Sequence, residues 1–369
     1  MLAEYETRMG DDRQSAVAPV GIVPAGIVYA SLDEPGIARR RAGKGFLYTG
    51  PNRARLTDAE ILGRIRALAV PPAWRDVWIC PRPDGHIQAV GYDANGRKQY
   101  RYHADFRAHR EGAKFDHMLE FAEALPALRR QVDADMQARG LGREKVLATV
   151  VNLLETTMIR VGNKSYARDN GSYGLTTLRC RHVRIERGEL RFNFAGKSGK
   201  VWRLGVRDRR VAKIVRACQE LPGQHLFQYL DDDGQAQVIS SADVNAYLKQ
   251  VSGSEITAKD FRTWAGTVLA VAALARVGPA ETKTAAKKTL RTVVQEVAAR
   301  LGNTPTICRK CYIHPAIQEA CLECVPGPDL GEWDGIETSG QGPGLRREEV
   351  AVLEFLRARM APKTNGSRR

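Results

Sequence analysis

The spacing of apolar residues changes near Asp105, from the alternation typical of β-strands to the 3.6-residue repeat of helices. Before this point, short runs rich in aromatic and β-branched residues, at 86–92 and 98–102, are separated by turn sequences such as Pro83-Asp84-Gly85. After it, longer stretches place apolar residues on one face, most clearly at 144–161. Two such patterns in succession predict an α+β protein with two regions of different class.

A short β segment interrupts the helical region. Runs at 182–185, 190–194 and 201–204, joined by glycine-containing turns, predict a three-stranded β-meander. Helices are predicted at 117–125, 128–139, 144–161, 206–221, 241–251, 257–276 and 280–301. We therefore expect four parts: a disordered leader at 1–22, a small β-rich N-terminal domain at 23–105, a mostly α-helical domain at 106–324 and a flexible basic tail at 325–369. The tail includes a short amphipathic stretch at 345–359.

Two expected helices begin with the residue types of a capping box. Thr57, with Glu60 three residues later, is expected to cap one helix within the β-rich region. Thr257, with Asp260 in the same relation, is expected to begin the helix that stops before Gly278. These signals give the two helices defined starting points.

The charge of the chain indicates its partner. There are 57 Lys and Arg residues against 42 Asp and Glu, a formal charge of +15. Such an excess commonly neutralises phosphates, so we expect a nucleic acid, with a generally basic surface as the alternative. The N-terminus has no basic segment followed by an apolar one, and no apolar run is long enough to span a bilayer. We expect a cytoplasmic, nucleoid-associated protein that makes no membrane contact.

Four of the seven cysteines have a spacing that structural zinc sites use, Cys308/Cys311 followed by Cys321/Cys324. Only nine residues connect the two halves, which is short for a zinc ribbon, and they include Tyr312. Cytoplasmic cysteines are ordinarily reduced. We therefore expect reduced cysteines that bind no metal, with a zinc site as the alternative.

Three separated basic residues and one tyrosine predict a reaction. Arg160, Lys197 and Arg262 could surround one phosphodiester, and Tyr312 could attack it. A tyrosine hydroxyl has a pKa of about 10 and is a poor nucleophile near neutral pH. Fixed positive charge stabilises the developing phenolate and the added charge on phosphorus, which predicts strand cleavage through a phosphotyrosine. Taken singly, each arginine fits a surface ion pair, and Lys197 fits an exposed turn.

The motifs, in this order, resemble those of type IB DNA topoisomerases of the small poxvirus-like kind, in its bacterial branch. The resemblance covers residues 25–323. It rests on a strand at 96–102 and on Ile159-Arg160-Val161-Gly162-Asn163, Phe194-Ala195-Gly196-Lys197 and Lys259-Asp260-Phe261-Arg262-Thr263. Asn303 stands where the poxvirus enzymes have histidine, and Tyr312 matches the nucleophile. Any one motif is weak, whereas the series is specific.

The resemblance implies roles for individual residues. The catalytic set is Tyr312, Arg160, Lys197, Arg262 and Asn303. Lys197 protonates the leaving 5′ oxygen, and Asn303 can donate a hydrogen bond but cannot transfer a proton. The implied DNA-binding residues are Arg97, Lys98, Gln99, Tyr100, Tyr102, Tyr166 and Lys259. Tyr100 and Tyr102 share one face of a strand, so a sheet core would explain them equally well.

The implied activity is ATP-independent relaxation of supercoiled double-stranded DNA by a monomer, through a transient 3′-phosphotyrosyl bond. The catalytic domain would have the fold shared with tyrosine recombinases. No GxxxxGK[ST] loop or acidic Mg²⁺-binding cluster occurs, so no cofactor is expected. One alternative is a tyrosine recombinase, although those enzymes usually have His-x-x-Arg where this chain has Lys259-x-x-Arg262. The other is a noncatalytic, zinc-dependent DNA-binding protein that uses the four cysteines.

Overall fold

The computed structural model describes residues 23–94, 96–325 and 344–360. The chain divides into two compact units, Met1–Lys114 and Phe115–Arg369, and the division falls inside helix α2 (Ala104–Gln137). The expected leader and most of the expected tail lie outside the described residues. Within the described ranges, no helix is long and apolar enough to cross a membrane.

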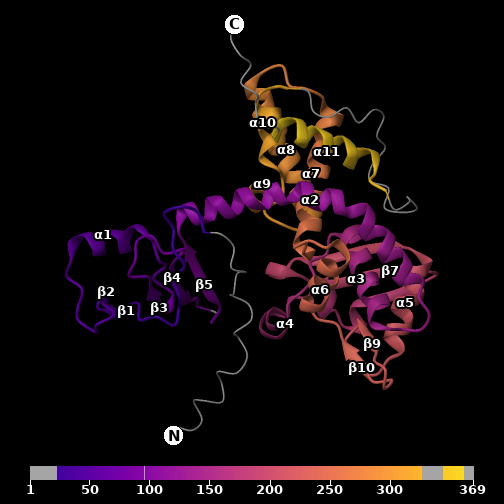
Figure 1. Cartoon of the computed structure of the whole chain (residues 1–369), viewed down its shortest axis with the longest axis horizontal. Helices are drawn as coiled ribbons and strands as arrows, with labels where there is room; N and C mark the ends of the chain where they lie inside the picture. The colour runs from indigo at the N-terminus through magenta and orange to yellow at the C-terminus, as the bar shows by residue number, and fades with distance from the viewer. Residues whose placement is uncertain (1–22, 95, 326–343, 361–369) are drawn as a thin grey trace. The chain divides into compact units, whose positions relative to one another are not determined.

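The first unit contains an antiparallel five-stranded sheet, helix α1 and the beginning of α2 (Figure 1). The sheet has the order β2-β1-β3-β4-β5, with strands at Ile37–Ala42 (β1), Gly45–Thr49 (β2), Arg75–Ile79 (β3), Ile87–Tyr92 (β4) and Lys98–Tyr102 (β5). Helix α1 (Ala59–Ala67) contributes Ile65 to a small core with Ile37, Val77, Ile79 and Ala89 of the sheet. The β-rich class predicted for this region is confirmed.

Two details of this unit differ from the expectation. The sequence of β1, Ile-Ala-Arg-Arg-Arg-Ala, shows no strand-like alternation, and the segment is a strand because it pairs with both β2 and β3. Helix α1 is capped by Asp58 rather than by Thr57, since the Asp58 carboxylate accepts hydrogen bonds from the N–H groups of Glu60 and Ile61. A carboxylate at this position also interacts favourably with the helix dipole.

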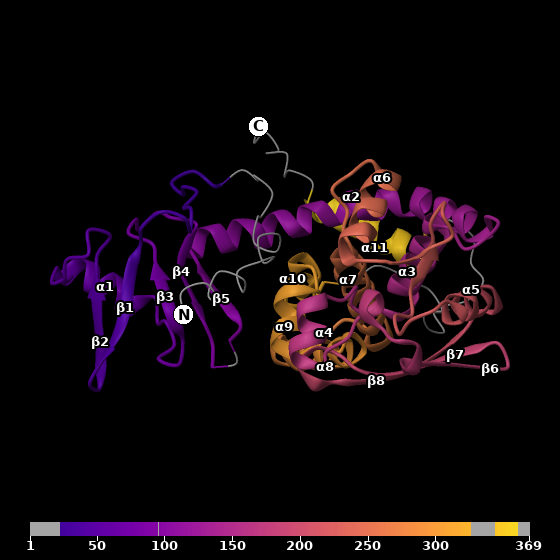
Figure 2. The same cartoon turned by 90° about the horizontal axis from the view of Figure 1, so that it is seen from below.

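The second unit is mostly helical and carries the antiparallel sheet β6-β7-β8, so the predicted meander is confirmed (Figure 2). Its strands are Val183–Glu186 (β6), Glu189–Ala195 (β7) and Val201–Arg207 (β8), and Gln228–Leu230 (β9) pairs with Ala236–Val238 (β10). The helices after α2 are Arg143–Thr157 (α3), Lys164–Asn170 (α4), Arg209–Glu220 (α5), Ser241–Ser252 (α6), Ala258–Val277 (α7), Lys283–Leu301 (α8), Pro305–Cys311 (α9), Pro315–Leu322 (α10) and Arg347–Met360 (α11).

Helices α3 and α7 form the centre of this unit. Each carries buried residues around much of its circumference, which is the pattern of a helix surrounded by neighbours. The start predicted for α7 is confirmed, because the Asp260 carboxylate accepts hydrogen bonds from the N–H and the hydroxyl of Thr257, each at 2.8 Å. Gly278, with φ 77°, ends the helix as expected.

The expectation of separate helices at 117–125 and 128–139 is wrong, because α2 continues through Pro126. Leu125 and Leu128 on either side of the proline are buried. Their packing offsets the main-chain hydrogen bond that proline cannot donate.

Helix α11 lies where the sequence predicts a flexible tail. Its residues Val352, Leu353 and Leu356 are buried in the hydrophobic core of the second unit. The apolar face of the amphipathic stretch is therefore a packed surface, and this part of the chain belongs to the second unit.

Candidate active site

Arg262 lies buried in the first half of α7, with 3% of its surface exposed. Its Nη1 donates to the main-chain oxygen of Met158, and its Nη2 donates to that of Leu301 at 2.5 Å. The guanidinium carbon lies 5.3 Å from the centre of the Tyr312 ring. The Nε donor is buried and has no hydrogen-bond partner among the described residues. Because such a donor is costly to leave unpaired, the side chain is suited to bind one further acceptor.

The segment after α3 presents Met158 to this guanidinium. Helix α3 ends at Thr157 rather than at 161, and Met158 adopts the left-handed conformation, with φ 57° and ψ 17°. This conformation is strained for a residue with a Cβ, and the contact between its carbonyl and Arg262 helps to hold it. Arg160 therefore stands on an irregular segment beyond the helix, not at the helix end as the sequence indicates.

Arg160 and Asn303 meet beside Arg262. Nη2 of Arg160 donates to Oδ1 of Asn303. Asn303 follows Gly302, the left-handed cap of α8, and its main-chain N–H donates to Ala298 at 2.9 Å. Its side-chain Nδ2 is buried without a partner in the described part of the chain. Since Oδ1 is engaged by Arg160, the amide leaves Nδ2 as an available donor.

Tyr312 caps the C-terminal end of α9 and is held against α7 by its main chain. The hydroxyl of Thr267 donates to the carbonyl oxygen of Tyr312 at 3.3 Å and accepts from the N–H of His314 at 3.1 Å. A Cβ added at Gly266 would lie 2.5 Å from the same carbonyl oxygen and 3.0 Å from the Tyr312 Cβ. Only glycine, which has no Cβ, allows the Tyr312 main chain to pack this closely against α7. This contact fixes the position of Tyr312 relative to Arg262 on the same helix.

The two arginines share one electrostatic environment. Burial, and then the charge of Arg160, lower the pKa of Arg262 from its usual value, whereas Tyr312 acts in the opposite direction. Neither guanidinium forms an ion pair with any carboxylate that the structure describes. Two adjacent positive charges with available donors favour an anion, and planar guanidinium groups fit phosphate oxygens well.

Lys197 lies at the tip of the β7–β8 hairpin, and it is exposed. The tip end of the hairpin is fastened to the last turn of α8, where Nζ of Lys200, directly after the turn, donates to a main-chain oxygen at 3.3 Å. A Cβ at Gly302 would lie 2.8 Å from the ring of Trp202, so hairpin and helix end are in close contact. The tip end of the hairpin is therefore anchored next to Asn303, and Lys197 beside it is exposed to a ligand.

The predicted DNA-binding residues are exposed or half-buried outside this cluster. In the second unit, Tyr166 on α4 and Lys259 in the first turn of α7 are exposed. In the first unit they lie on β5, the edge strand of the sheet, except Arg97, which directly precedes it. The set there is Arg97 and Lys98, both exposed, Gln99, which donates to Asp93 at 3.0 Å, and Tyr100 and Tyr102, whose half-buried rings stack with centroids 6.0 Å apart.

The four cysteines of the two Cys-x-x-Cys pairs are divided between α9, which carries Cys308 and Cys311, and the end of α10, which carries Cys321 and is followed by Cys324. Cys308 is buried in α9, and burial raises the pKa of its thiol to about 11. Cys321 lies on α10 and contacts the main-chain oxygen of Ala286. Over the described ranges, no group of three or more Cys, His, Asp and Glu side chains is placed to hold a metal ion.

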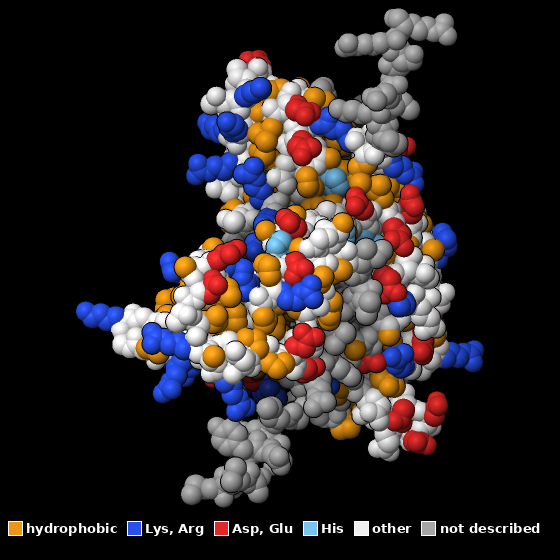
Figure 3. All heavy atoms as spheres, turned by 60° about the vertical axis from the view of Figure 1, so that its left-hand side comes forward, with side chains coloured by type: hydrophobic (Ala, Val, Ile, Leu, Met, Phe, Trp, Pro, Cys, Tyr) orange, Lys and Arg blue, Asp and Glu red, His pale blue; other side chains and the backbone are white. Residues whose placement is uncertain are grey.

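Positive charge alone does not mark the site. On the face shown in Figure 3, Lys and Arg side chains alternate with Asp and Glu. Arg160 and Arg262 differ from these surface charges because they lie beside each other without a carboxylate, and because Arg262 is buried.

Three residues that shape this cluster are not indicated by the sequence motifs. The left-handed conformation of Met158 depends on the tertiary contact with Arg262, so no local sequence pattern predicts it. Thr267 is buried but looks like an ordinary helix residue. Gly266 does leave a signal, because a glycine inside a helix costs about 1 kcal/mol relative to alanine and usually has a packing reason.

The chain matches two protein-family models. Residues 103–322 match the catalytic core of eukaryotic DNA topoisomerase I, and residues 45–93 match the N-terminal domain of bacterial DNA topoisomerase IB. The first match contains every residue of the cluster and Lys197.

Viral proteins are among the curated relatives. DNA topoisomerase 1B of Acanthamoeba polyphaga mimivirus is 32% identical over 285 residues, which cover 75% of this chain and 85% of the relative. DNA topoisomerase 1B of vaccinia virus (strain Copenhagen) is 25% identical, with 62% and 71% covered. DNA topoisomerase 1 of rabbit fibroma virus (strain Kasza) is 24% identical, with 62% and 70% covered.

Proposed function

The chain belongs to the type IB DNA topoisomerase family, and we propose that Arg160, Arg262 and Asn303 bind one phosphodiester of duplex DNA. The observation that carries this assignment is the set of available donors at one place. Nε of Arg262 and Nδ2 of Asn303 are buried without partners among the described residues, beside a guanidinium pair that has no carboxylate. Nonbridging phosphate oxygens supply the acceptors and the negative charge that this arrangement lacks.

Tyr312 is the nucleophile in this proposal. Its ring lies under the Arg262 guanidinium, and Gly266 and Thr267 hold its main chain. A fixed positive charge stabilises a phenolate as the hydroxyl loses its proton, and it stabilises the charge that gathers on phosphorus. The phenolic oxygen forms a bond to phosphorus, and the bond from phosphorus to the 5′ oxygen breaks.

Lys197 is the proton donor to the departing 5′ oxygen. An exposed lysine at a hairpin tip can enter a DNA groove, and its ammonium group can donate a proton to the departing oxygen. The resulting 3′-phosphotyrosyl bond conserves the energy of the broken linkage. Rotation of the free end releases torsion, and attack by the 5′ hydroxyl restores the strand.

Asn303 contributes a hydrogen bond and no proton. An amide has no titratable group near neutral pH, so its role is confined to charge stabilisation at a nonbridging oxygen. Its orientation is set by Arg160, and loss of either side chain should therefore disturb the other.

Relaxation of a supercoiled plasmid should proceed in EDTA and without ATP, because side-chain charges occupy the role that a metal ion has in other strand-cleaving enzymes. The rate should be proportional to protein concentration if one molecule acts alone on one duplex, as we propose for this cytoplasmic, nucleoid-associated enzyme. A time course on agarose gels measures both.

Inactivity of the folded protein in EDTA, together with release of one equivalent of zinc, would favour the zinc-dependent alternative. A requirement for a second DNA site would favour a recombinase.

Arg97→Ala and Lys98→Ala should each weaken DNA binding and reduce its salt dependence, by about one unit of slope in log Kd against log salt for each lost phosphate contact. The reason is that these two exposed residues, at the start of edge strand β5 and directly before it, are proposed to contact phosphates and release counterions from the DNA backbone. Titrations at several salt concentrations measure the slope. Arg66→Ala, an exposed arginine on α1 of the same unit, is the matched control and should keep it. An unchanged slope in all three variants would place the DNA contacts elsewhere.

A further inference from the structure

Helix α11 lies beyond residue 322, where the match to the catalytic-core model ends. Its apolar side is buried in the second unit, and it also carries two buried glutamates, Glu348, which is 6% exposed, and Glu349, which is 3% exposed and whose carboxylate is bound by a charged side chain of another helix. No step of the reaction proposed above uses this carboxylate. A buried charge is costly unless it is paired, so its partners indicate what the helix does.

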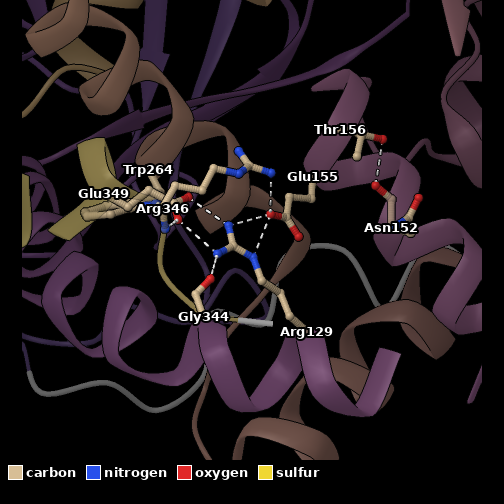
Figure 4. A network of polar contacts seen from close by, with 8 residues as sticks. All are labelled: Arg129, Asn152, Glu155, Thr156, Trp264, Gly344, Arg346 and Glu349. Carbon is tan, nitrogen blue, oxygen red and sulfur yellow. Dashed lines mark hydrogen bonds and ion pairs between the residues drawn. The ribbon is translucent and has the colours of Figure 1, made fainter. Parts of the chain in front are cut away.

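Arg129 of α2 binds this carboxylate with both terminal nitrogens (Figure 4). Nη1 donates to Oε2 of Glu349 at 2.9 Å, and Nη2 donates to Oε1 at 2.8 Å. Nε and Nη2 also donate to Oε1 of Glu155 on α3, at 2.9 and 2.6 Å, and Nη1 donates to the main-chain oxygen of Gly344. Every N–H group of the guanidinium is thereby engaged, in a side chain only 11% exposed.

The network reaches both segments that carry the arginines of the site. Glu155 lies in the last turn of α3, directly before the segment 158–160, and it also accepts a hydrogen bond from Nη2 of Arg346 at 3.3 Å. On α7, Nε1 of Trp264 donates to Oε1 of Glu349 at 3.3 Å, two residues after the buried arginine of that helix. One carboxylate of α11 is thus joined to α2 and α7 directly, and to the end of α3 through Arg129.

We propose that Glu349 and Arg129 are positioning residues, which hold the end of α3 and thereby the segment that presents Met158 and Arg160 to the phosphate. The proposal rests on the role assigned above to Arg160. A guanidinium shared by two carboxylates in a mostly buried position has few alternative arrangements. The last turn of a helix without such a partner frays easily. Helix α11 therefore stabilises the position of the active-site segment through Glu349.

Loss of the Glu349 carboxylate has a defined structural consequence. Arg129 would keep one carboxylate and would be left partly unpaired in a buried position. The guanidinium and Glu155 would shift to regain hydrogen bonds, and the end of α3 would move with them. A displacement of about 1 Å far from the chemistry can slow a reaction about 10²-fold, because the reacting groups lose alignment.

Single-turnover cleavage by the full chain tests this inference. Glu349→Ala, and Glu349→Gln, which keeps the shape and removes the charge, should lower the cleavage rate constant about 10- to 100-fold at an unchanged Kd for DNA. The time course gives the rate constant, and its final amplitude gives the fraction of active protein, so partial unfolding lowers the amplitude alone. Arg357→Ala is the matched control on the same helix, since its ion pair with Glu123 at 2.6 Å is exposed, and it should keep the wild-type rate constant.

A double-mutant cycle identifies the residue through which Glu349 acts. In an Arg160→Ala background, Glu349→Ala should lower the rate constant by a much smaller factor than in the wild type, because the residue that it positions is absent. In a Lys197→Ala background the full factor should remain, since Lys197 lies on a separate hairpin. Equal factors in all three backgrounds, or a wild-type rate constant in Glu349→Ala, would overturn the proposal. A wild-type rate constant in Arg160→Ala alone would overturn the role of Arg160 and, with it, the proposal.

Discussion

Replacing Tyr312 by phenylalanine should abolish covalent capture of DNA while binding persists. The substitution removes one hydroxyl oxygen and keeps the ring that lies under Arg262, so the phosphate site remains assembled. Loss of a nucleophile lowers a rate by about 10⁴-fold or more, because the other groups of the site have nothing to activate. A nicked suicide substrate, which traps the covalent adduct by losing the strand that would religate, measures the effect.

The matched control for this variant is Tyr166→Phe. Tyr166 is an exposed tyrosine of the same unit that is proposed to contact DNA and not to attack it. It should still form the adduct, with at most weaker binding. An adduct on the Tyr312→Phe protein would mean that another residue is the nucleophile.

Lys197→Ala should slow cleavage of ordinary DNA by about 10²- to 10⁴-fold, the usual share of a general acid. The alkoxide of the departing 5′ oxygen is a poor leaving group until it receives a proton. Sulfur in place of this bridging oxygen departs as a thiolate, which needs no proton. The modified substrate should therefore restore much of the rate that Lys197→Ala loses, as single-turnover cleavage would show.

Arg262→Ala gives the contrasting result on the same substrate. Its contribution concerns charge on the nonbridging oxygens, which the sulfur substitution leaves in place. The thiolate substrate should consequently restore little of its lost rate. Equal restoration of both variants, or of neither, would show that the proton comes from a residue other than Lys197.

Local sequence patterns anticipate those parts of the fold whose cause is itself local. The start of α7 follows from Thr257 and Asp260, and the strands of the meander follow from alternating apolar residues between glycine turns. Strand β1 and the continuous helix through Pro126 escape these patterns, because pairing and packing by distant segments decide them.

The same distinction applies to the site. Motif order singles out Arg160, Arg262, Asn303 and Tyr312, and the structure brings these four together. It does not reveal that Arg160 stands beyond its helix, since the end of α3 is set by the strained Met158 and its distant partner. Nor does it assign Glu349, which lies outside the motifs and acts through a network of side chains from four helices.

The packing of α11 bears on how small a working version of this enzyme can be made. A fragment that stopped where the family match stops, at 322, would keep all five proposed catalytic residues. It would also expose the core that Val352 and Leu356 cover, and would strip the Arg129 guanidinium of one counterion. The family match thus ends at residue 322, before the end of the segment that folds cooperatively. We therefore expect a minimal enzyme to extend at least to Met360. Trimming the sequence to the matched region would remove α11, which is a structural component of the site.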